Sequence, residues 1–451
     1  MVARGLSRGS VCRDRFRAGK TARGVTAWRT PSMSQTPGTA ALPFTERLDR
    51  LAEVAVRVGL GLKAGQELVM TAPLEAVPLA RAITEQAYKA GASLVTTFYA
   101  DDAATLARFA HAPDEAFDRA AGWLYAGMAD AYRSGAARLA ISGDDPSLLA
   151  GQDPSKVARA NRSRSQAYVP ALELIAGFST NWTIVSAATK PWARTVFPDL
   201  PEDEAVARLW DAVFAASRID GPDPVAAWGA HNRDLARRTA RLNGARFSAL
   251  RFRGPGTDLT VGLADDHEWC GGATTAKNGI VCNANIPTEE VFTTPHRARV
   301  EGYVASTKPL SYQGTLIDDI RVRFSEGRIV EANARTGSDV LAKVLDTDEG
   351  AARLGEVALV PASSAISASG LLFYNTLYDE NAASHIALGQ AYSKCFRNGG
   401  DGLSESDLAE RGANRSLIHI DWMIGSAEID VDGITASGEA LPVMRRGEWA
   451  D

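Results

Sequence analysis

The hydrophobic pattern of the chain changes near residue 244, and this change limits the folds that the chain can adopt. Before that point strands and helices alternate: residues 67–71 and 93–99 read as strands around a helix over 76–90. Further strands at 138–142 and 182–187 continue the alternation. Parallel neighbours need long crossover connections, which helices supply. We therefore expect an α/β domain with a largely parallel sheet over residues 44–244.

After residue 244 the chain shows short alternating strands and glycine turns, as in ARFSALRFRGPGTDLTVGL and IRVRFSEGRIVEAN. One helix is expected over residues 380–392. The pattern predicts a second, strand-rich α+β domain over residues 245–451. Residues 1–43 form a basic leader, expected to be disordered, because residues 1–32 hold seven Arg and one Lys against one acid, Asp14.

Composition excludes several classes of partner. The net charge is −5, so no overall positive field favours nucleic acid or a membrane surface, and small or peptidic substrates fit better. No apolar run approaches the ~18 residues that a transmembrane helix needs. The four cysteines have neither zinc-knuckle spacing nor disulfide-scaffold density, and we expect them to be reduced. The expected location is the cytoplasm.

Residue types that bind metals gather in the last third of the chain: Glu290, Glu356, His385, His419 and Asp421. Three carboxylates and two imidazoles suit a two-metal hydrolase, since carboxylates can bridge two divalent ions and each imidazole holds one. The set indicates hydrolysis.

Metal binding is not the only interpretation of the acidic residues in two of these segments. Glu289 and Glu290 precede a β-prone stretch, and on an extended backbone their side chains point to opposite faces, so only one is a ready ligand. A solvated acidic pair is the alternative. Glu356 lies in the apolar strand LGEVALVP, where a buried charge needs a partner or a metal. Its alternative is an exposed strand end.

The remaining candidates lie in two segments. His385 and Tyr392, seven residues apart on the expected helix, share one face; a core histidine and a packed tyrosine are the alternatives. His419 and Asp421 are two residues apart in the apolar run SLIHIDWMIGS, so both face one side of a strand. A satisfied buried pair is the alternative there.

The segments NIPTEEVFTTP, LGEVALVP, ENAASHIALGQAY and IHIDWMIGS, in this order, resemble the M29 family of metallo-aminopeptidases. The resemblance extends from about residue 44 to the carboxyl terminus through LKAGQELVMTAP and EGRIVEANA. It implies two divalent ions (Zn, Co or Mn) held by Glu290, Glu356, His385, His419 and Asp421. It also implies catalysis by Tyr392, a homodimer, and short peptides as substrates.

The resulting hypothesis is an aminopeptidase. Glu356 or Asp421 bridges the ions, Tyr392 donates a hydrogen bond to the oxyanion, and Glu289 or Glu290 carries a proton to the leaving amine. Two alternatives stay open at this point: a two-metal hydrolase of a non-peptide amide, and a metal-free dimeric binding protein that keeps these residues as a polar core.

Overall fold

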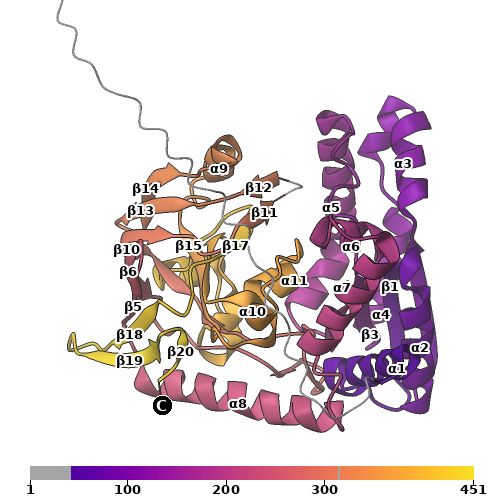
Figure 1. The fold of residues 1–451 in the computed structure, drawn as a ribbon, viewed down its shortest axis with the longest axis horizontal. Coiled ribbons are helices and arrows are strands. Elements are labelled where there is room, and N and C mark those ends of the chain that lie inside the picture. The colour runs from indigo at the N-terminus through magenta and orange to yellow at the C-terminus, as the bar shows by residue number, and fades with distance from the viewer. Residues whose placement is uncertain (1–41, 313–314, 451) are drawn as a thin grey trace, which may run out of the picture. The chain divides into compact units, whose positions relative to one another are not determined.

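The computed structural model describes residues 42–312 and 315–450 of the chain (Figure 1). The expected leader, residues 1–43, falls almost entirely outside the described residues. None of the helices within 42–312 and 315–450 combines the length and the apolar character that a bilayer crossing demands.

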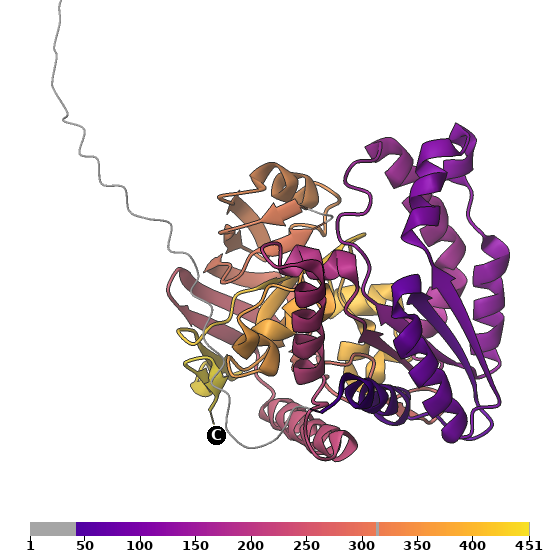
Figure 2. The ribbon, with the colours of Figure 1, turned by 45° about the vertical axis from the view of Figure 1, so that its right-hand side comes forward.

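The first region is built on a four-stranded, fully parallel sheet of order β2-β1-β3-β4, which confirms the expected α/β fold. Figure 2 brings this sheet and the helices beside it forward. Helices supply the crossovers that parallel pairing requires. The strands are β1 (Glu67–Pro73), β2 (Leu94–Ala100), β3 (Ala137–Ser142) and β4 (Trp182–Ser186). The helices are α1 (Phe44–Val54), α2 (Val77–Lys89), α3 (Asp102–His111), α4 (Gly122–Arg133), α5 (Pro154–Ala176), α6 (Lys190–Val196) and α7 (Glu202–Ala216).

A long helix, α8 (Pro224–Ala245), joins this region to the strand-rich one. Asp223 caps its first turn by accepting a hydrogen bond from the backbone N–H of Ala226, and Pro224 occupies the first turn, where its missing N–H costs nothing. Arg246 ends the helix in the left-handed conformation. The helix ends at Ala245, next to the position near residue 244 where the hydrophobic pattern of the sequence changes.

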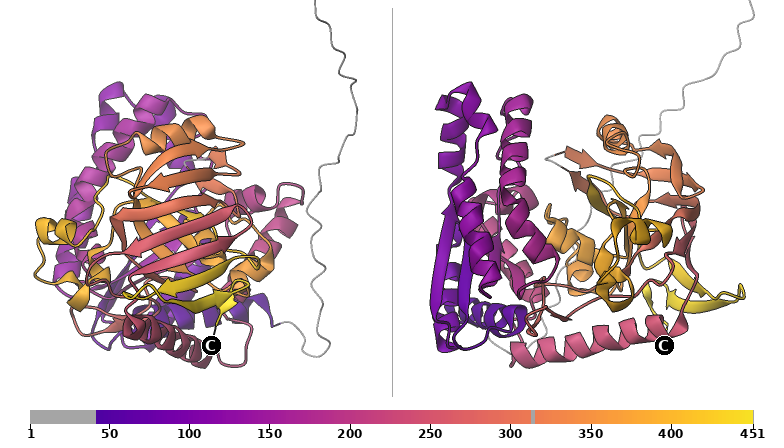
Figure 3. Two further views of the ribbon diagram at one scale, coloured as in Figure 1. Left: turned by 90° about the vertical axis from the view of Figure 1, so that its left-hand side faces the viewer. Right: turned by 180° about the vertical axis from the view of Figure 1, so that it is seen from behind.

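The second region contains an eight-stranded antiparallel sheet of order β14-β13-β10-β6-β5-β18-β19-β20, seen face on in the left panel of Figure 3. Its strands are β5 (Ala249–Gly254), β6 (Thr257–Leu263), β10 (Pro295–Ala305), β13 (Arg321–Ser325), β14 (Arg328–Asn333), β18 (Asp430–Ile434), β19 (Ala440–Arg445) and β20 (Glu448–Trp449). Short helices complete the region: α9 (Ser338–Leu345), α10 (Ala365–Ser369), α11 (Thr376–Asp379) and α12 (Glu405–Glu410). Two small hairpins pair β7 (Thr274–Thr275) with β8 (Val281–Cys282) and β11 (Leu310–Tyr312) with β12 (Thr315–Ile317).

A second antiparallel sheet, of order β17-β16-β15-β9, shares a hydrophobic core with the first. Its strands are β9 (Val291–Thr293), β15 (Leu354–Leu359), β16 (His385–Gly389) and β17 (His419–Met423). Phe252 and Val261 of the large sheet belong to the same buried cluster as Val357, Ile386 and Trp422 of the small one. This core supports the sheet that carries the polar candidates.

The prediction of a helix over residues 380–392 is wrong. Only Glu380–Ala382 form a short 3-10 helix, and His385–Gly389 form the strand β16. All five residues of β16 are buried, and a segment buried on both faces has no period that separates strand from helix. The helix-favouring composition of this segment gave a weak preference, which pairing with β15 and β17 overrode.

Candidate metal centre

The small sheet brings four of the candidate residues to one face. Glu356 of β15 and Asp421 of β17 both pair with Ala387 of the strand between them. Directly paired residues face the same side of a sheet, and so do residues two apart on one strand. His385 lies two residues before Ala387, and His419 lies two residues before Asp421. The methyl group of Ala387 therefore lies among four side chains, two carboxylates and two imidazoles, that can each bind a metal ion.

Glu290, the fifth candidate, reaches the same face from the end of the chain segment that enters β9, the strand beside β15. His385 Nε2 lies 3.2 Å from Glu290 Oε2 and 3.5 Å from Glu356 Oε1. His419 Nε2 lies 3.8 Å from Glu356 Oε2 and 3.4 Å from Asp421 Oδ1. The structure thus brings all five expected ligand residues together.

The donors fall into two groups of three, Glu290–Glu356–His385 and Glu356–His419–Asp421, each with its donor atoms within 4.8 Å of one another. Glu356 belongs to both groups, with one oxygen facing each histidine. A carboxylate shared in this way has the geometry of a bridge between two cations.

Backbone carbonyls orient the imidazoles. His385 Nδ1 donates to Ala383 O at 3.1 Å, and His419 Nδ1 donates to Gln390 O at 2.7 Å. Since a carbonyl only accepts, each Nε2 is left to face the carboxylates. This is the arrangement by which metal-binding histidines are held in one tautomer.

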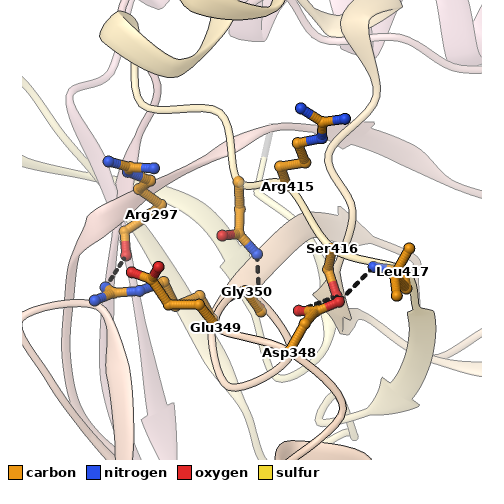
Figure 4. A pocket seen from close by; sticks show the side chains of 9 residues that line it. Arg297, Asp348, Glu349, Gly350, Arg415, Ser416 and Leu417 are labelled. Atoms are coloured by element: carbon orange, nitrogen blue, oxygen red, sulfur yellow. Dashed lines mark hydrogen bonds between the residues drawn. The ribbon is translucent and has the colours of Figure 1, made fainter.

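The loop before His419 is anchored separately (Figure 4). Asp348 accepts hydrogen bonds from Ser416 Oγ at 2.8 Å and from the backbone N–H of Leu417 at 2.6 Å. Asn414 Nδ2 donates to Gly350 O at 2.8 Å and to Gly389 O at 2.7 Å, which ties this loop to the end of β16. A separate cavity of about 340 Å³ is lined by Asp348, Gly350, Asn414, Ser416 and Leu417, among others.

The charges of the centre call for cations. Burial, together with the neighbouring Glu290 and Asp421, raises the pKa of Glu356. Burial acts to lower the pKa of His385, but the adjacent carboxylates of Glu290 and Glu356 raise it well above the usual value. Three buried atoms, Glu290 Oε2, His385 Nε2 and Asp421 Oδ1, make no well-aligned hydrogen bond among the described residues. Carboxylate and imidazole donors without hydrogen-bond partners fit divalent metal ions.

Glu380 belongs to this centre, and the sequence reasoning missed it. Burial, followed by the charges of Glu290 and Asp421, raises the pKa of its carboxyl well above the usual value. Glu380 begins the short 3-10 helix before β16, so no strand or helix period points it at the ligands. Its only signal in the sequence is an acid five residues before His385.

Tyr392 also lies at the centre, although it follows β16 in a loop instead of sharing a helix with His385. Its ring centroid is 4.7 Å from that of His419. Burial and the charges of Glu356 and Asp421 raise the pKa of its hydroxyl, which therefore remains a proton donor at neutral pH.

Glu289 faces away from these ligands. Its oxygens lie 2.7 Å from Arg218 Nη1 and 2.9 Å from Arg218 Nη2, and one lies 3.8 Å from His231 Nε2. Its backbone N–H donates to Asn381 Oδ1 at 2.7 Å. A catalytic role for Glu289 stays a prediction, and its contacts connect the segment around Glu290 to the first region of the protein.

The family described as thermophilic metalloprotease (M29) matches residues 44–449. The chain belongs to the M29 family. Aminopeptidase T of Thermus thermophilus is 56% identical over 406 residues, covering 90% of this chain and 99% of the relative. Aminopeptidase 2 of Geobacillus stearothermophilus is 46% identical over 407 residues, covering 90% and 98%.

A solved structure, wild-type AmpT from Thermus thermophilus, matches with a TM-score of 0.86 at 55% identity. The match covers 91% of this chain and all of that one. The M29 match therefore spans both the parallel sheet and the sheet that carries the candidate ligands.

Proposed function

We propose that this M29 protein is an aminopeptidase that removes the first residue of short peptides with the help of two divalent ions. Membership of a metalloprotease family and relatives named aminopeptidase support the enzyme class. The observation that carries the two-ion proposal is Glu356, whose two oxygens face two separate groups of donors.

Charge balance supports the same number of ions. Glu290, Glu356, Glu380 and Asp421 carry −4 when all are ionised, and two divalent ions supply +4. Glu290 and His385 would hold one ion, His419 and Asp421 would hold the other, and Glu356, which belongs to both groups, would be shared between them. Zn, Co and Mn all accept this donor set. When bound, such ions polarise a substrate carbonyl and make an attacking water more acidic.

The protein's own groups manage the proton and the oxyanion. Glu380 accepts the proton of the attacking water and returns it to the leaving amine, because its carboxyl is buried beside Glu290 and Asp421, and burial and these charges raise its pKa and so its affinity for a proton. The Tyr392 hydroxyl donates a hydrogen bond to the oxygen that gains charge as the carbonyl is attacked. Glu289, held by Arg218, keeps Glu290 in place.

The experiment measures chromophore release from leucyl and other aminoacyl amides by metal-stripped protein, with and without Zn, Co or Mn. N-acetylated amides serve as controls. Metal-restored cleavage of the free-amine substrates alone supports the proposal. Equal cleavage of acetylated substrates contradicts an aminopeptidase, and bound-metal analysis giving one ion per active chain contradicts the two-ion site.

We further propose that the protein works as a homodimer in the cytoplasm. The family resemblance supports the dimer, and the free state of Cys270, Cys282 and Cys395 suits a reducing compartment. Light scattering of the full chain at micromolar concentration measures the oligomeric state, and a monomer would contradict this part.

A further inference from the structure

Two cysteines that are 125 residues apart in the sequence meet beside the metal centre. Cys270 exchanges two backbone hydrogen bonds of 2.9 Å with Phe292 of β9. Cys395 ends a 3-10 helix, Ser393–Cys395, and its carbonyl accepts a 2.7 Å hydrogen bond from the N–H of Glu268. Both thiols belong to a small apolar cluster with Phe292 and Ala358.

The two cysteines pack together in this cluster. Cys270 Sγ donates a 3.5 Å hydrogen bond to the carbonyl oxygen of Lys394, the residue directly before Cys395. Neither cysteine forms a disulfide. The third described cysteine, Cys282, lies in a different cluster with Phe178 and Ala276.

We propose that Cys270 and Cys395 form a modification site, a thiol pair that hydroperoxides oxidise to a disulfide and thiol reductants restore. The roles of the two residues differ. Cys270 is partly exposed and Cys395 is buried, so an oxidant reaches Cys270 first. A reactive, accessible cysteine beside a second, resolving cysteine is the usual arrangement of an oxidation-sensitive pair.

The electrostatics agree with this division. The hydrogen bond from Cys395, with help from the Lys394 ammonium, lowers the pKa of the Cys270 thiol. Burial raises the pKa of the Cys395 thiol well above its usual value. Cys270 therefore has more thiolate character, and the thiolate is the nucleophilic form.

The chemistry balances with hydrogen peroxide as oxidant. The Cys270 thiolate attacks one peroxide oxygen, so an S–O bond forms, the O–O bond breaks, and the departing oxygen leaves as water after protonation. The Cys395 sulfur then attacks the Cys270 sulfenic acid. The S–S bond forms, and the hydroxyl leaves as a second water with the Cys395 proton. Two thiols lose two electrons and two protons to one peroxide.

Oxidation would act on Tyr392, and this part rests on the proposed function. The N–H of Cys395 donates to Tyr392 O at 3.2 Å, and the Lys394 ammonium lies 5.6 Å from the centroid of the Tyr392 ring. A disulfide bond holds two sulfurs closer than packed thiols lie, so its formation draws the segment that carries Cys395 toward Cys270. A displacement of this kind at an oxyanion donor lowers turnover by about 10- to 100-fold.

The test treats the full-length, Zn-loaded chain with hydrogen peroxide, since Zn has no redox chemistry of its own. Parent, Cys270→Ser, Cys395→Ser and the matched control Cys282→Ser are compared by peptide mapping under non-reducing conditions. Parent and Cys282→Ser are expected to give a Cys270–Cys395 cross-linked peptide and a 10- to 100-fold loss of turnover. Dithiothreitol should restore turnover without any change in bound zinc. Both cysteine variants of the pair should lack the cross-link.

The outcomes separate the two proposals. If peroxide yields no Cys270–Cys395 peptide in the parent, the modification site is refuted, whatever the activity. If the cross-link forms while turnover is unchanged, the coupling to Tyr392 is refuted. If the reduced, Zn-loaded parent cleaves no aminoacyl amide, the proposed function fails, and the peptide map still decides the thiol pair.

Discussion

Tyr392→Phe tests the oxyanion role of Tyr392 with the smallest change that the chain allows. The contacts of the aromatic ring are kept in the variant. The ring centroid of residue 392 lies 4.7 Å from that of His419 and 6.4 Å from that of Phe292, and the Lys394 ammonium lies 5.6 Å from it. Only the hydroxyl is lost, and it is protonated at neutral pH because burial and the charges of Glu356 and Asp421 raise its pKa. Removing one oxyanion donor costs about 10²- to 10³-fold in kcat, or ~3 kcal/mol.

The assay is steady-state cleavage of leucyl amides by the metal-loaded variant, with bound metal measured on the same sample. We expect kcat to fall by about 100-fold or more while KM changes little, because the contact forms only in the transition state. Tyr303→Phe is the matched control, since Tyr303 is 53% exposed on β10 of the other sheet. A kcat within twofold of the parent, or a change confined to KM, would refute the role.

Three further predictions concern the metal-binding histidines, the buried ion pair of Arg218 and Glu289, and the dependence of stability on pH. His385→Ala and His419→Ala should each lower bound metal from two ions to about one per chain and turnover by at least ~100-fold, with an unchanged circular dichroism spectrum; full metal content in either would contradict the two groups of donors. Arg218→Met should lower the free energy of unfolding by about 3 kcal/mol, because it leaves Glu289 buried without its partner, and Glu289→Gln in the same chain should recover part of this loss in urea titrations. Burial lowers the pKa of His267 below 6.5, so the folded state binds fewer protons there than the unfolded state, and stability should fall as the pH drops below 6.5. His267→Gln should make the decline of stability between pH 6.5 and 5 less steep, and an unchanged slope would contradict a contribution from His267.

Much of the first region followed from the sequence. The parallel sheet was predictable because each strand is bounded by turn residues and separated from the next by an amphipathic helix. The spacing of His419 and Asp421 was also sufficient, since an apolar strand turns residues two apart to the same face. β17 confirms that reading.

The secondary structure of the segment around His385 could not be predicted from its hydrophobic pattern. It is buried on both faces, so its alternation carries no information, and its alanines favour a helix. Tyr392 was expected beside His385 through a helical turn, whereas a loop brings it to the ring of His419. Glu380 precedes the strand in a single 3-10 turn, where no period exists to show the direction of its side chain.

The centre depends on long-range register more than on any local motif. Glu356 and Asp421 share a face only because both pair with Ala387, and a slip of one residue in either pairing would turn a ligand to the opposite face. Gly389 helps to fix this register: its φ is +100°, and a Cβ there would lie 2.1 Å from Ile418 O, so the strands meet closely only with glycine at this position. Asn414 then bonds Gly389 O and holds the loop that leads into His419. Local sequence therefore identifies the ligand residue types, but strand pairings between distant segments assemble them. The paired residues Val291 and Leu359, for example, are 68 residues apart, and no local pattern records such a pairing.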